Sequence, residues 1–382
     1  MSAAEIVFWV FAVLIAYTYV GYPLLLAVAC LFKRPPRLPE TTDWPRLSVL
    51  VVAFNEEQGI LAKIRNLLAC DYPADRIEVI VCSDGSTDRT NELVTTFGDP
   101  RVKLAATQEN RGVNEAFAHG AQQASGDLLL MTDSGGLFEP QALKIAIRHF
   151  ADPTVGCVNG LFDHTNPEGR PVAGGYRGYW AIETIVRLLE TRLGYGCVIV
   201  GAFEVLRRSL YRPIASDLTN DMLVPMEVYA RGFRTVYEPR ASLGAPQQKD
   251  TGQEFNRRVR VAVRGWCSLP KLLRAVPVWK TPVNWAVLWS HKYMRWLTGP
   301  MMIGLLAASA LLGDHPLYRW ALAAQLVFYA AALLGLLLSL ALPRIPKMLV
   351  LAYWFCLVQA AGMVGLAKAL RGRRIGTWKP EP

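Results

Sequence analysis

Apolar and polar residues follow different patterns at the two ends and in the middle of this chain. Near the start, Ile6 to Phe32 is an almost continuous apolar run, longer than the ~20 residues that a helix needs to cross a bilayer. Further apolar runs with short polar breaks between them cover Met301 to Leu312, Leu317 to Leu342 and Met348 to Ala367. We therefore predict a transmembrane anchor over residues 1–32 and membrane segments over residues 297–370.

The middle of the chain alternates short apolar runs with amphipathic helical patterns. After the first run, Ile60, Ile64 and Leu67 recur at helical spacing, and a second apolar run follows. A strand, a helix and a strand with short connections form a βαβ unit of a parallel sheet. We predict an α/β domain over residues 47–250 with a mostly parallel sheet flanked by helices. Its predicted strands are Leu47 to Ala53, Ile77 to Cys82, Val102 to Ala106, Asp127 to Thr132, Cys197 to Val205 and Phe233 to Glu238.

Polar side chains follow three of these predicted strands. Asn55 and Glu56 come after the first, Asp84 after the second and Asp133 after the fourth. The carboxyl ends of parallel strands meet at one edge of a sheet, where open α/β sheets bind ligands. A lone Asp-Gly pair is a plain surface turn about as often as it is part of a binding site. Several strand ends that bring polar groups to one edge favour a binding site.

Composition and charge indicate a membrane and anionic ligands. The chain has 382 residues, 52% of them hydrophobic, which is too apolar for an ordinary soluble enzyme. Its net charge is +10, and after Glu254 only Asp314 and Glu381 are acidic. Basic residues beside apolar segments suit an anionic membrane surface and phosphate-bearing ligands rather than nucleic acid. The seven cysteines lack C-x-x-C spacing, so we expect no disulfide framework and a reducing compartment.

The basic residues also give an orientation. Lys33, Arg34 and Arg37 follow the first apolar run, whereas a signal peptide has its positive charges in front, so we predict an uncleaved anchor. The positive-inside tendency then puts the next domain in the cytoplasm, after a linker over residues 33–46. Residues 371–382 form a basic tail. If every apolar run crossed the membrane, this tail would lie outside, so we expect one run to be re-entrant or interfacial.

Residues 251–296 are predicted to lie on the membrane surface. Gln253 to Arg274 interleaves basic and apolar residues, which is typical of interfacial helices, with a solvated charged face as the alternative. Asn284 to Trp296 carries tryptophan and tyrosine residues, which gather at the headgroup level. The arginines of the first stretch are candidates for binding a diphosphate. They include Arg257, Arg258 and Arg260.

Several short motifs occur in a specific order. They are V-V-A-F-N-E-E from Val51, D-G-S-T-D-R-T from Asp84, R-G at Arg111, T-D-S-G from Thr132, G-A-F-E-V-L-R-R from Gly201 and T-N-D from Thr219. In this combination the chain resembles the membrane-anchored, non-processive members of the family 2 glycosyltransferases, which have the GT-A fold. The resemblance extends from about Leu47 to Trp266.

This resemblance implies roles for individual residues. Asp133 would face the diphosphate of a nucleotide-sugar donor or its divalent cation, Mg²⁺ or Mn²⁺. Asp221 matches the catalytic base, which takes a proton from the acceptor hydroxyl, with a plain helix N-cap as the alternative. Glu190 lies in a region that approaches the acceptor in the family. The residues implied in donor binding are Ala53, Asn55, Glu56, Asp84, Arg111 and Asp133.

The chain departs from the family pattern at several positions. The usual D-x-D is Asp133-Ser134-Gly135 here, so the second carboxylate is missing. A cation would be held by fewer protein oxygens, or it would be absent. Val113 replaces a common lysine, and Asn220 replaces the glutamate of the usual T-E-D.

The resemblance implies an inverting enzyme that transfers one sugar from a nucleotide-diphosphate donor. The expected acceptor is a lipid-linked saccharide or a polysaccharide precursor, and the expected place is the cytoplasmic face of a bacterial inner membrane. Processive synthases carry Q-x-x-R-W near Trp266, where this chain has R-R-V-R-V-A-V-R-G-W. A processive polysaccharide synthase and a catalytically degenerate subunit of an envelope-polysaccharide assembly are the alternatives. The sequence leaves the sugar and the oligomeric state open.

Overall fold

The computed structural model describes residues 1–382 except 34–40, 42, 164–171, 245–250, 343–344 and 377–382. Its strands are β1 (Leu47–Ala53), β2 (Ile77–Asp84), β3 (Val102–Thr107), β4 (Leu128–Asp133), β5 (Leu137–Phe138), β6 (Val155–Asp163), β7 (Glu204–Arg207) and β8 (Arg234–Gly244). Its α-helices are α1 (Ala3–Ala16), α2 (Tyr22–Leu31), α3 (Ile60–Ala69), α4 (Thr90–Thr95), α5 (Val113–Gln122), α6 (Ala142–Ile147), α7 (Val172–Leu193), α8 (Asn220–Ala230), α9 (Thr251–Ala275), α10 (Pro282–Leu288), α11 (Met294–Leu311), α12 (Pro316–Ala341) and α13 (Lys347–Leu370).

All the described strands join one mixed sheet in the order β3-β2-β1-β4-β7-β6-β8-β5. The first half is parallel, with β1 between β2 and β4. The short strand β7 runs antiparallel to both β4 and β6. The chain leaves β1 towards β2 on one side and later returns to β4 on the other, which makes the β1–β4 boundary the topological switch point.

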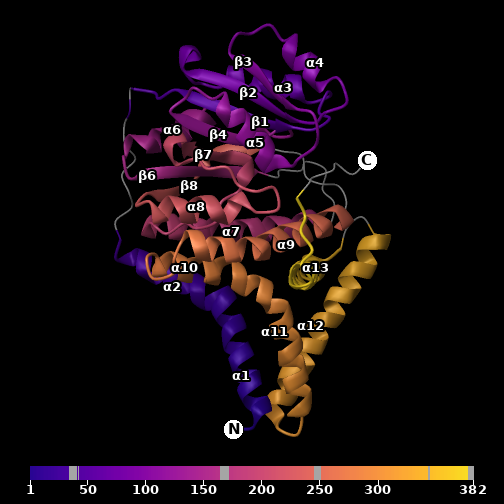
Figure 1. Ribbon diagram of the computed structural model, residues 1–382. Coiled ribbons are helices and arrows are strands. Elements are labelled where there is room, and N and C mark those ends of the chain that lie inside the picture. The colour runs from indigo at the N-terminus through magenta and orange to yellow at the C-terminus, as the bar shows by residue number, and fades with distance from the viewer. Residues whose placement is uncertain (34–40, 42, 164–171, 245–250, 343–344, 377–382) are drawn as a thin grey trace.

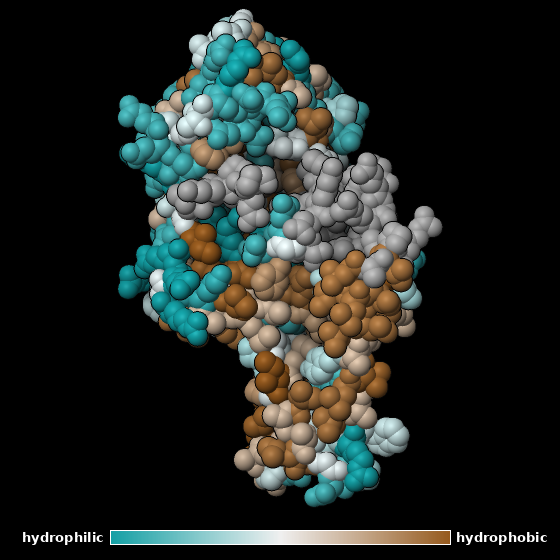
Figure 2. Space-filling view, turned by 90° about the vertical axis from the view of Figure 1, so that its right-hand side faces the viewer, coloured by the Kyte–Doolittle hydropathy of each residue, from teal (hydrophilic) through white to brown (hydrophobic). Residues whose placement is uncertain are grey.

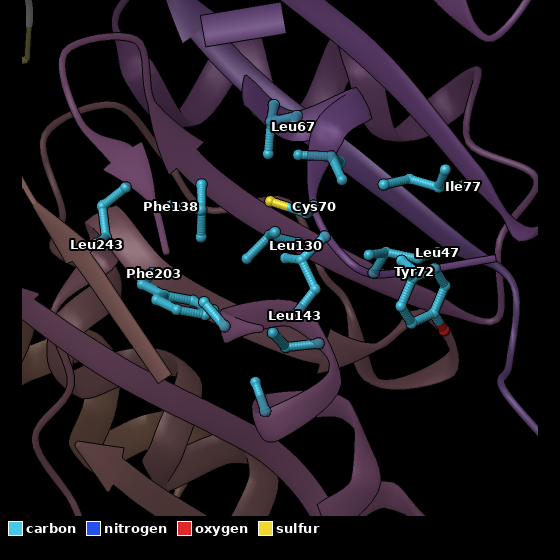
Figure 3. Packing of buried hydrophobic residues seen from close by; sticks show 14 of the residues in the cluster. Leu47, Leu67, Cys70, Tyr72, Ile77, Leu130, Phe138, Leu143, Phe203 and Leu243 are labelled. Carbon is cyan, nitrogen blue, oxygen red and sulfur yellow. The ribbon is translucent and has the colours of Figure 1, made fainter. Parts of the chain in front are cut away.

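Helices cover both faces of this sheet and enclose two apolar cores (Figure 1). Figure 3 shows the core under α3 and α6, where Leu67, Leu130 and Phe138 point towards one another. Phe138 also meets Phe203 edge to face, with 4.8 Å between the ring centroids. The second core lies under α5 and α8 and continues to α9 and α10.

Below the sheet domain, apolar helices form a stem. Among the residues that the structure describes, three helical segments are long and apolar enough to cross a membrane, namely Ala3–Leu31, Pro316–Leu340 and Lys347–Leu370. In Figure 1, α1, α11 and α12 extend away from the domain, whereas α13 is seen end-on beneath α9. Figure 2 shows hydrophobic side chains over the stem and hydrophilic ones over the upper domain. The chain therefore consists of an α/β domain and a stem of membrane-associated helices.

The structure corrects three expectations about elements. The predicted strand from Cys197 to Val205 is wrong, because Gly201–Phe203 forms a 3-10 turn and β7 begins only at Glu204. Strand β6 was not predicted. Strand β8 continues past Pro239, which has no N–H to donate, because the β6–β8 register shifts opposite this position.

Helix α7 exposes part of its apolar surface. Ile182 and Ile185 are more than half exposed, at 57% and 56%. Val186 of the same helix is buried in a cluster with Tyr22 and Leu26 of α2, and Leu189 packs against this cluster.

Candidate active site

The loops after β1 and β2 are tied together by side chains from both. Asn55 has a left-handed backbone, with φ of 54°, which is uncommon for a residue other than glycine. Its side-chain oxygen accepts a hydrogen bond from the Thr87 N–H at 2.8 Å, and its own N–H donates to the Ser86 hydroxyl at 3.1 Å. Ala53, at the end of β1, is buried. This bonding fixes the edge of the sheet where the two strands end.

Asp84 at the end of β2 holds the R-G turn. One carboxylate oxygen accepts a hydrogen bond from the Arg111 N–H and the other from the Gly112 N–H, both at 2.8 Å. Gly112 has a φ of 98°, which favours glycine at this position. The same loop also approaches the end of the chain, since a Cβ on Gly112 would lie 2.5 Å from the Gly376 carbonyl oxygen.

Asp133 ends β4 with an exposed side chain. Surrounding protein raises its pKa, the positive charge of Lys63 opposes this rise, and the negative charge of Asp221 adds to it. Glu56 lies close by. Burial raises the pKa of Glu56, and the negative charge of Asp133 raises it further, whereas a hydrogen bond from Ser134 lowers it. These carboxylates from distant parts of the chain are therefore near enough to influence one another.

Asp221 lies in the first turn of α8. The N-cap of this helix is Thr219, so the interpretation of Asp221 as a plain N-cap is wrong. The Asp221 carbonyl accepts a hydrogen bond from the Ile199 N–H at 3.0 Å. A Cβ on Gly201 would lie 3.4 Å from the Asp221 carboxylate, so glycine leaves room beside it. The Asp221 side chain thus lies against the turn before β7.

A second carboxylate near Asp221 was not singled out in the sequence. Glu204 is fully buried at the start of β7, and neither of its carboxylate oxygens has a hydrogen-bond partner. Burial raises its pKa well above the usual value, and the charge of Asp221 raises it further. Both effects favour the neutral, protonated form of Glu204. The signal in the sequence was a charged residue inside an apolar stretch.

Arg264 of α9 supports the loop before Asp221. Its Nε donates to the Leu218 carbonyl at 3.0 Å, and a second guanidinium nitrogen donates to the same oxygen. Burial lowers the pKa of Arg264, and the charges of Asp221 and Asp217 oppose this decrease. Helix α9, predicted as interfacial, thus also contacts the acidic edge.

Comparison with known proteins agrees with this geometry. Residues 48–214 match the family described as Glycosyl transferase family 2. Poly-beta-1,6-N-acetyl-D-glucosamine synthase of Staphylococcus aureus (strain COL) is 28% identical over 230 residues, which cover 57% of this chain and 54% of that protein. An N-acetylglucosaminyltransferase of Rhizobium meliloti (strain 1021) is 30% identical over 248 residues, covering 58% of each. The chain thus spans a little more than half the length of these relatives.

A solved structure shows the same fold. The mannosyltransferase PcManGT from Pyrobaculum calidifontis, in complex with GDP-Man and Mn²⁺, superimposes with a TM-score of 0.73 at 24% identity. The match covers 96% of this chain and 99% of that one. The chain carries a family 2 glycosyltransferase domain. Its expected GT-A fold is confirmed.

Within this glycosyltransferase domain, the predicted site residues fall into two groups. Glu56, Asp133 and Asp221 interact through their charges at the edge of the sheet. Asn55, Asp84 and Arg111 belong to the loops beside them. Their roles in donor binding and catalysis stay predictions.

The predicted acceptor and phosphate contacts lie elsewhere. Glu190 is fully buried, where it accepts a hydrogen bond from the Tyr22 hydroxyl at 2.5 Å and pairs with His291 at 2.7 Å. Arg257 and Arg258 both pair with Glu254, at 2.7 and 2.8 Å. Arg260 is half-buried on the same helix. Contacts of these residues with an acceptor or phosphate stay predictions.

Glu190 belongs to an ionic network that the sequence did not reveal. Glu183 accepts hydrogen bonds from Arg187 at 2.9 Å and Arg295 at 2.5 Å, and it pairs with His291 at 2.9 Å. Burial opposes ionisation of Glu183, but the charges around it outweigh burial and hold its pKa well below the usual value. Burial also opposes protonation of His291, yet Glu190 and Glu183 raise its pKa. This network joins α7 to the membrane helices.

The domain does not present a complete set of protein ligands for a cation. Among the described residues, no three histidine, cysteine, aspartate or glutamate side chains converge on one point as metal ligands. Gly135 supplies no carboxylate, although a side chain there would meet nothing within 4 Å. The turn itself thus offers one exposed carboxylate, that of Asp133. These residues do not fit a cation held by the protein alone.

Proposed function

We propose that this chain is an inverting glycosyltransferase that moves a single sugar from a nucleotide-diphosphate sugar to a lipid-linked or polysaccharide-precursor acceptor. The reaction takes place at the cytoplasmic face of a bacterial inner membrane. One observation carries the proposal: the charges of Asp133 and Asp221 interact at the carboxyl edge of a GT-A sheet, next to its switch point.

The donor lies along this edge in the proposal. The base and ribose contact the loops of Asn55, Glu56 and Asp84, which are tied to each other by hydrogen bonds before any ligand arrives. The diphosphate faces the turn that begins at Asp133. Because this turn follows β4 at the switch point, the anomeric carbon comes to lie between Asp133 and Asp221.

Asp221 acts as the general base. The acceptor hydroxyl oxygen attacks the anomeric carbon from the face opposite the diphosphate. The new C–O bond forms while the bond to the diphosphate breaks, and the nucleoside diphosphate leaves with the electron pair. The hydroxyl proton passes to the Asp221 carboxylate. Attack from the opposite face inverts the anomeric configuration.

Transfer of one sugar per acceptor is proposed because Q-x-x-R-W is missing. Gly265 stands immediately before Trp266, and the ring of Trp296 fills the space over it, since a Cβ there would lie 2.1 Å from a ring carbon. This leaves no space for an arginine. Processive synthesis is the second candidate, supported by a relative named as a polymer synthase. Product length on a gel separates the two: one added sugar supports the first and a ladder the second.

The proposed membrane arrangement has α1, α11 and α12 crossing the bilayer and α13 lying at the surface. Two contacts support this. A Cβ on Gly365 of α13 would lie 2.5 Å from the Ala262 methyl of α9, and Arg374 after α13 pairs with Asp217 of the sheet domain at 3.0 Å. The basic tail then lies on the cytoplasmic side, in keeping with the positive-inside tendency. Periplasmic labelling of Asp314→Cys, but not of Arg373→Cys, is the expected result.

A screen of nucleotide sugars tests the activity. Detergent-solubilised protein is incubated with each donor and a lipid-linked saccharide extract, with and without Mn²⁺, and release of the free nucleoside diphosphate is measured. Both curated relatives are named for N-acetylglucosamine, so we expect a nucleotide-diphosphate N-acetylglucosamine to react first. Absence of release with every donor, in both conditions, would favour the degenerate-subunit alternative.

A further inference from the structure

A buried lysine lies directly under the turn that presents Asp133. Lys63 of α3 is fully buried, and its ammonium group donates hydrogen bonds to the Thr132 hydroxyl at 3.2 Å and to the Gly136 carbonyl. Thr132 precedes Asp133, and Gly136 follows Gly135. One ammonium group therefore holds both ends of the Asp133-Ser134-Gly135 stretch.

Packing alone does not explain a lysine at this position. Ile60, Ile64 and Leu67, which share its helix face, are completely buried in the core shown in part in Figure 3. An apolar residue of similar length would fill the same volume without desolvating a charge, which costs several kcal/mol. The ammonium also lies over the Phe138 ring, 4.5 Å from its centroid. The two hydrogen bonds from Lys63 to Thr132 and Gly136 point to a role at the turn above it.

Burial lowers the pKa of Lys63 to about 7, and the negative charge of Asp133 opposes this decrease. The protonated ammonium group in turn opposes the rise in the pKa of Asp133. The second carboxylate of the usual motif is absent at Gly135, and the space for it is open. The turn thus combines one protein carboxylate with one protein cation beneath it. A nucleoside diphosphate that approached the turn would meet less negative charge than at a turn with two carboxylates.

We propose that Lys63 is a positioning residue that holds the Asp133 turn in place and supplies positive charge beneath the donor diphosphate. The donor site then binds a nucleoside diphosphate with a reduced need for a divalent cation. This inference rests on the proposed function, because it takes the donor diphosphate to lie at the Asp133 turn.

The test measures binding of UDP and GDP to the detergent-solubilised full chain by calorimetry, once with EDTA and once with excess Mn²⁺. The variants are Lys63→Met and Gly135→Asp, with Lys144→Met as the matched control. Lys144 is a lysine of the same sheet domain whose partner is Asp71, at 2.5 Å. The quantity compared is the ratio of the two dissociation constants, without and with Mn²⁺.

Loss of the ammonium charge should weaken binding in EDTA by about tenfold and leave binding with Mn²⁺ nearly unchanged, because the added cation then neutralises Asp133. Gly135→Asp should widen the same ratio by about tenfold, since it adds a carboxylate where there is open space. Lys144→Met should leave the ratio as in the unaltered chain.

Equal weakening in both conditions for Lys63→Met would mean a purely structural lysine and would overturn the proposal. If that variant fails to fold, Gly135→Asp decides alone, and an unchanged ratio overturns the proposal. Failure of the unaltered chain to bind either nucleotide in both conditions would instead contradict the proposed function. The two failures are therefore distinguishable.

Discussion

Carboxylates gather at two places in this molecule, and their surroundings differ. Where α7 meets the membrane helices, Glu183 is surrounded by Arg187, His291 and Arg295, and its pKa is held low. At the edge of the sheet, the surrounding protein and the negative charge of Asp221 raise the pKa values of the exposed Asp133 and the buried Glu204.

This difference distinguishes a structural carboxylate cluster from one that is suited to a reaction. A carboxylate whose charge is neutralised by buried cations holds two elements together, and its oxygens are already occupied by hydrogen bonds. A carboxylate beside other carboxylates is electrostatically unfavourable until a cation, a proton or a substrate hydroxyl arrives, and such groups gather at functional sites. We therefore propose that the first cluster anchors α7 and that the second takes part in the reaction.

The largest expected effect on stability is at the anchoring cluster. Glu183→Ala leaves Arg187, Arg295 and His291 buried without their shared partner, which should cost about 3–5 kcal/mol. The apparent melting temperature of the detergent-solubilised protein measures this loss. Glu92→Ala is the control, since Glu92 forms only an exposed pair with Arg89. Equal melting temperatures for both variants would contradict an anchoring role for the network.

A smaller effect is expected at Glu78, a matched carboxylate at the opposite end of β2 from Asp84. Burial opposes its ionisation, but Lys103, Ser48 and Ser125 outweigh burial and lower its pKa from 4.5 to about 2. Its stabilisation is therefore present above pH 4.5 and is lost as the pH falls towards 2.

Glu78→Gln should thus lower stability by about 2 kcal/mol at neutral pH. The difference from the unaltered chain should shrink as the pH falls below 4.5. Apparent melting temperatures across this range measure it. A constant difference at every pH would show that the carboxylate charge of Glu78 is not what stabilises the strand.

The smallest expected effect is at Glu204. Glutamine has the shape of a neutral glutamic acid, and burial raises the pKa of Glu204. Glu204→Gln should therefore change the transfer rate by less than about threefold. Initial rates measure this effect. A loss of a hundredfold or more would show that Glu204 ionises during the reaction. Glu204 would then be a second candidate for the general base beside Asp221.

Much of the fold was predictable because β-branched runs and helical spacing are local signals. They identified β1, β2, β3, β4 and α3, and they placed Asp84 and Asp133 at strand ends. Strand β7 was misplaced because the apolar stretch before Glu204 shows no alternation that separates a turn from a strand. Strand β6 was missed because glycine and asparagine interrupt it.

The site was predictable only in part, for a different physical reason. Motif residues could be found, but partners distant in sequence could not, and Glu183 pairs with His291 across 108 positions. Lys63 had a usable signal: it falls between Ile60 and Leu67 on the apolar face of α3, where a lysine must find buried partners.

The most direct test of the central claim is a paired measurement on Asp221→Asn. Transfer rate and nucleoside-diphosphate affinity are determined on the same preparation of the full chain. The account predicts a rate at least a hundredfold lower, because the base is lost, with affinity changed less than about threefold, because the donor loops are intact. An unchanged rate would remove Asp221 from catalysis and contradict the assignment of the acidic edge to the reaction.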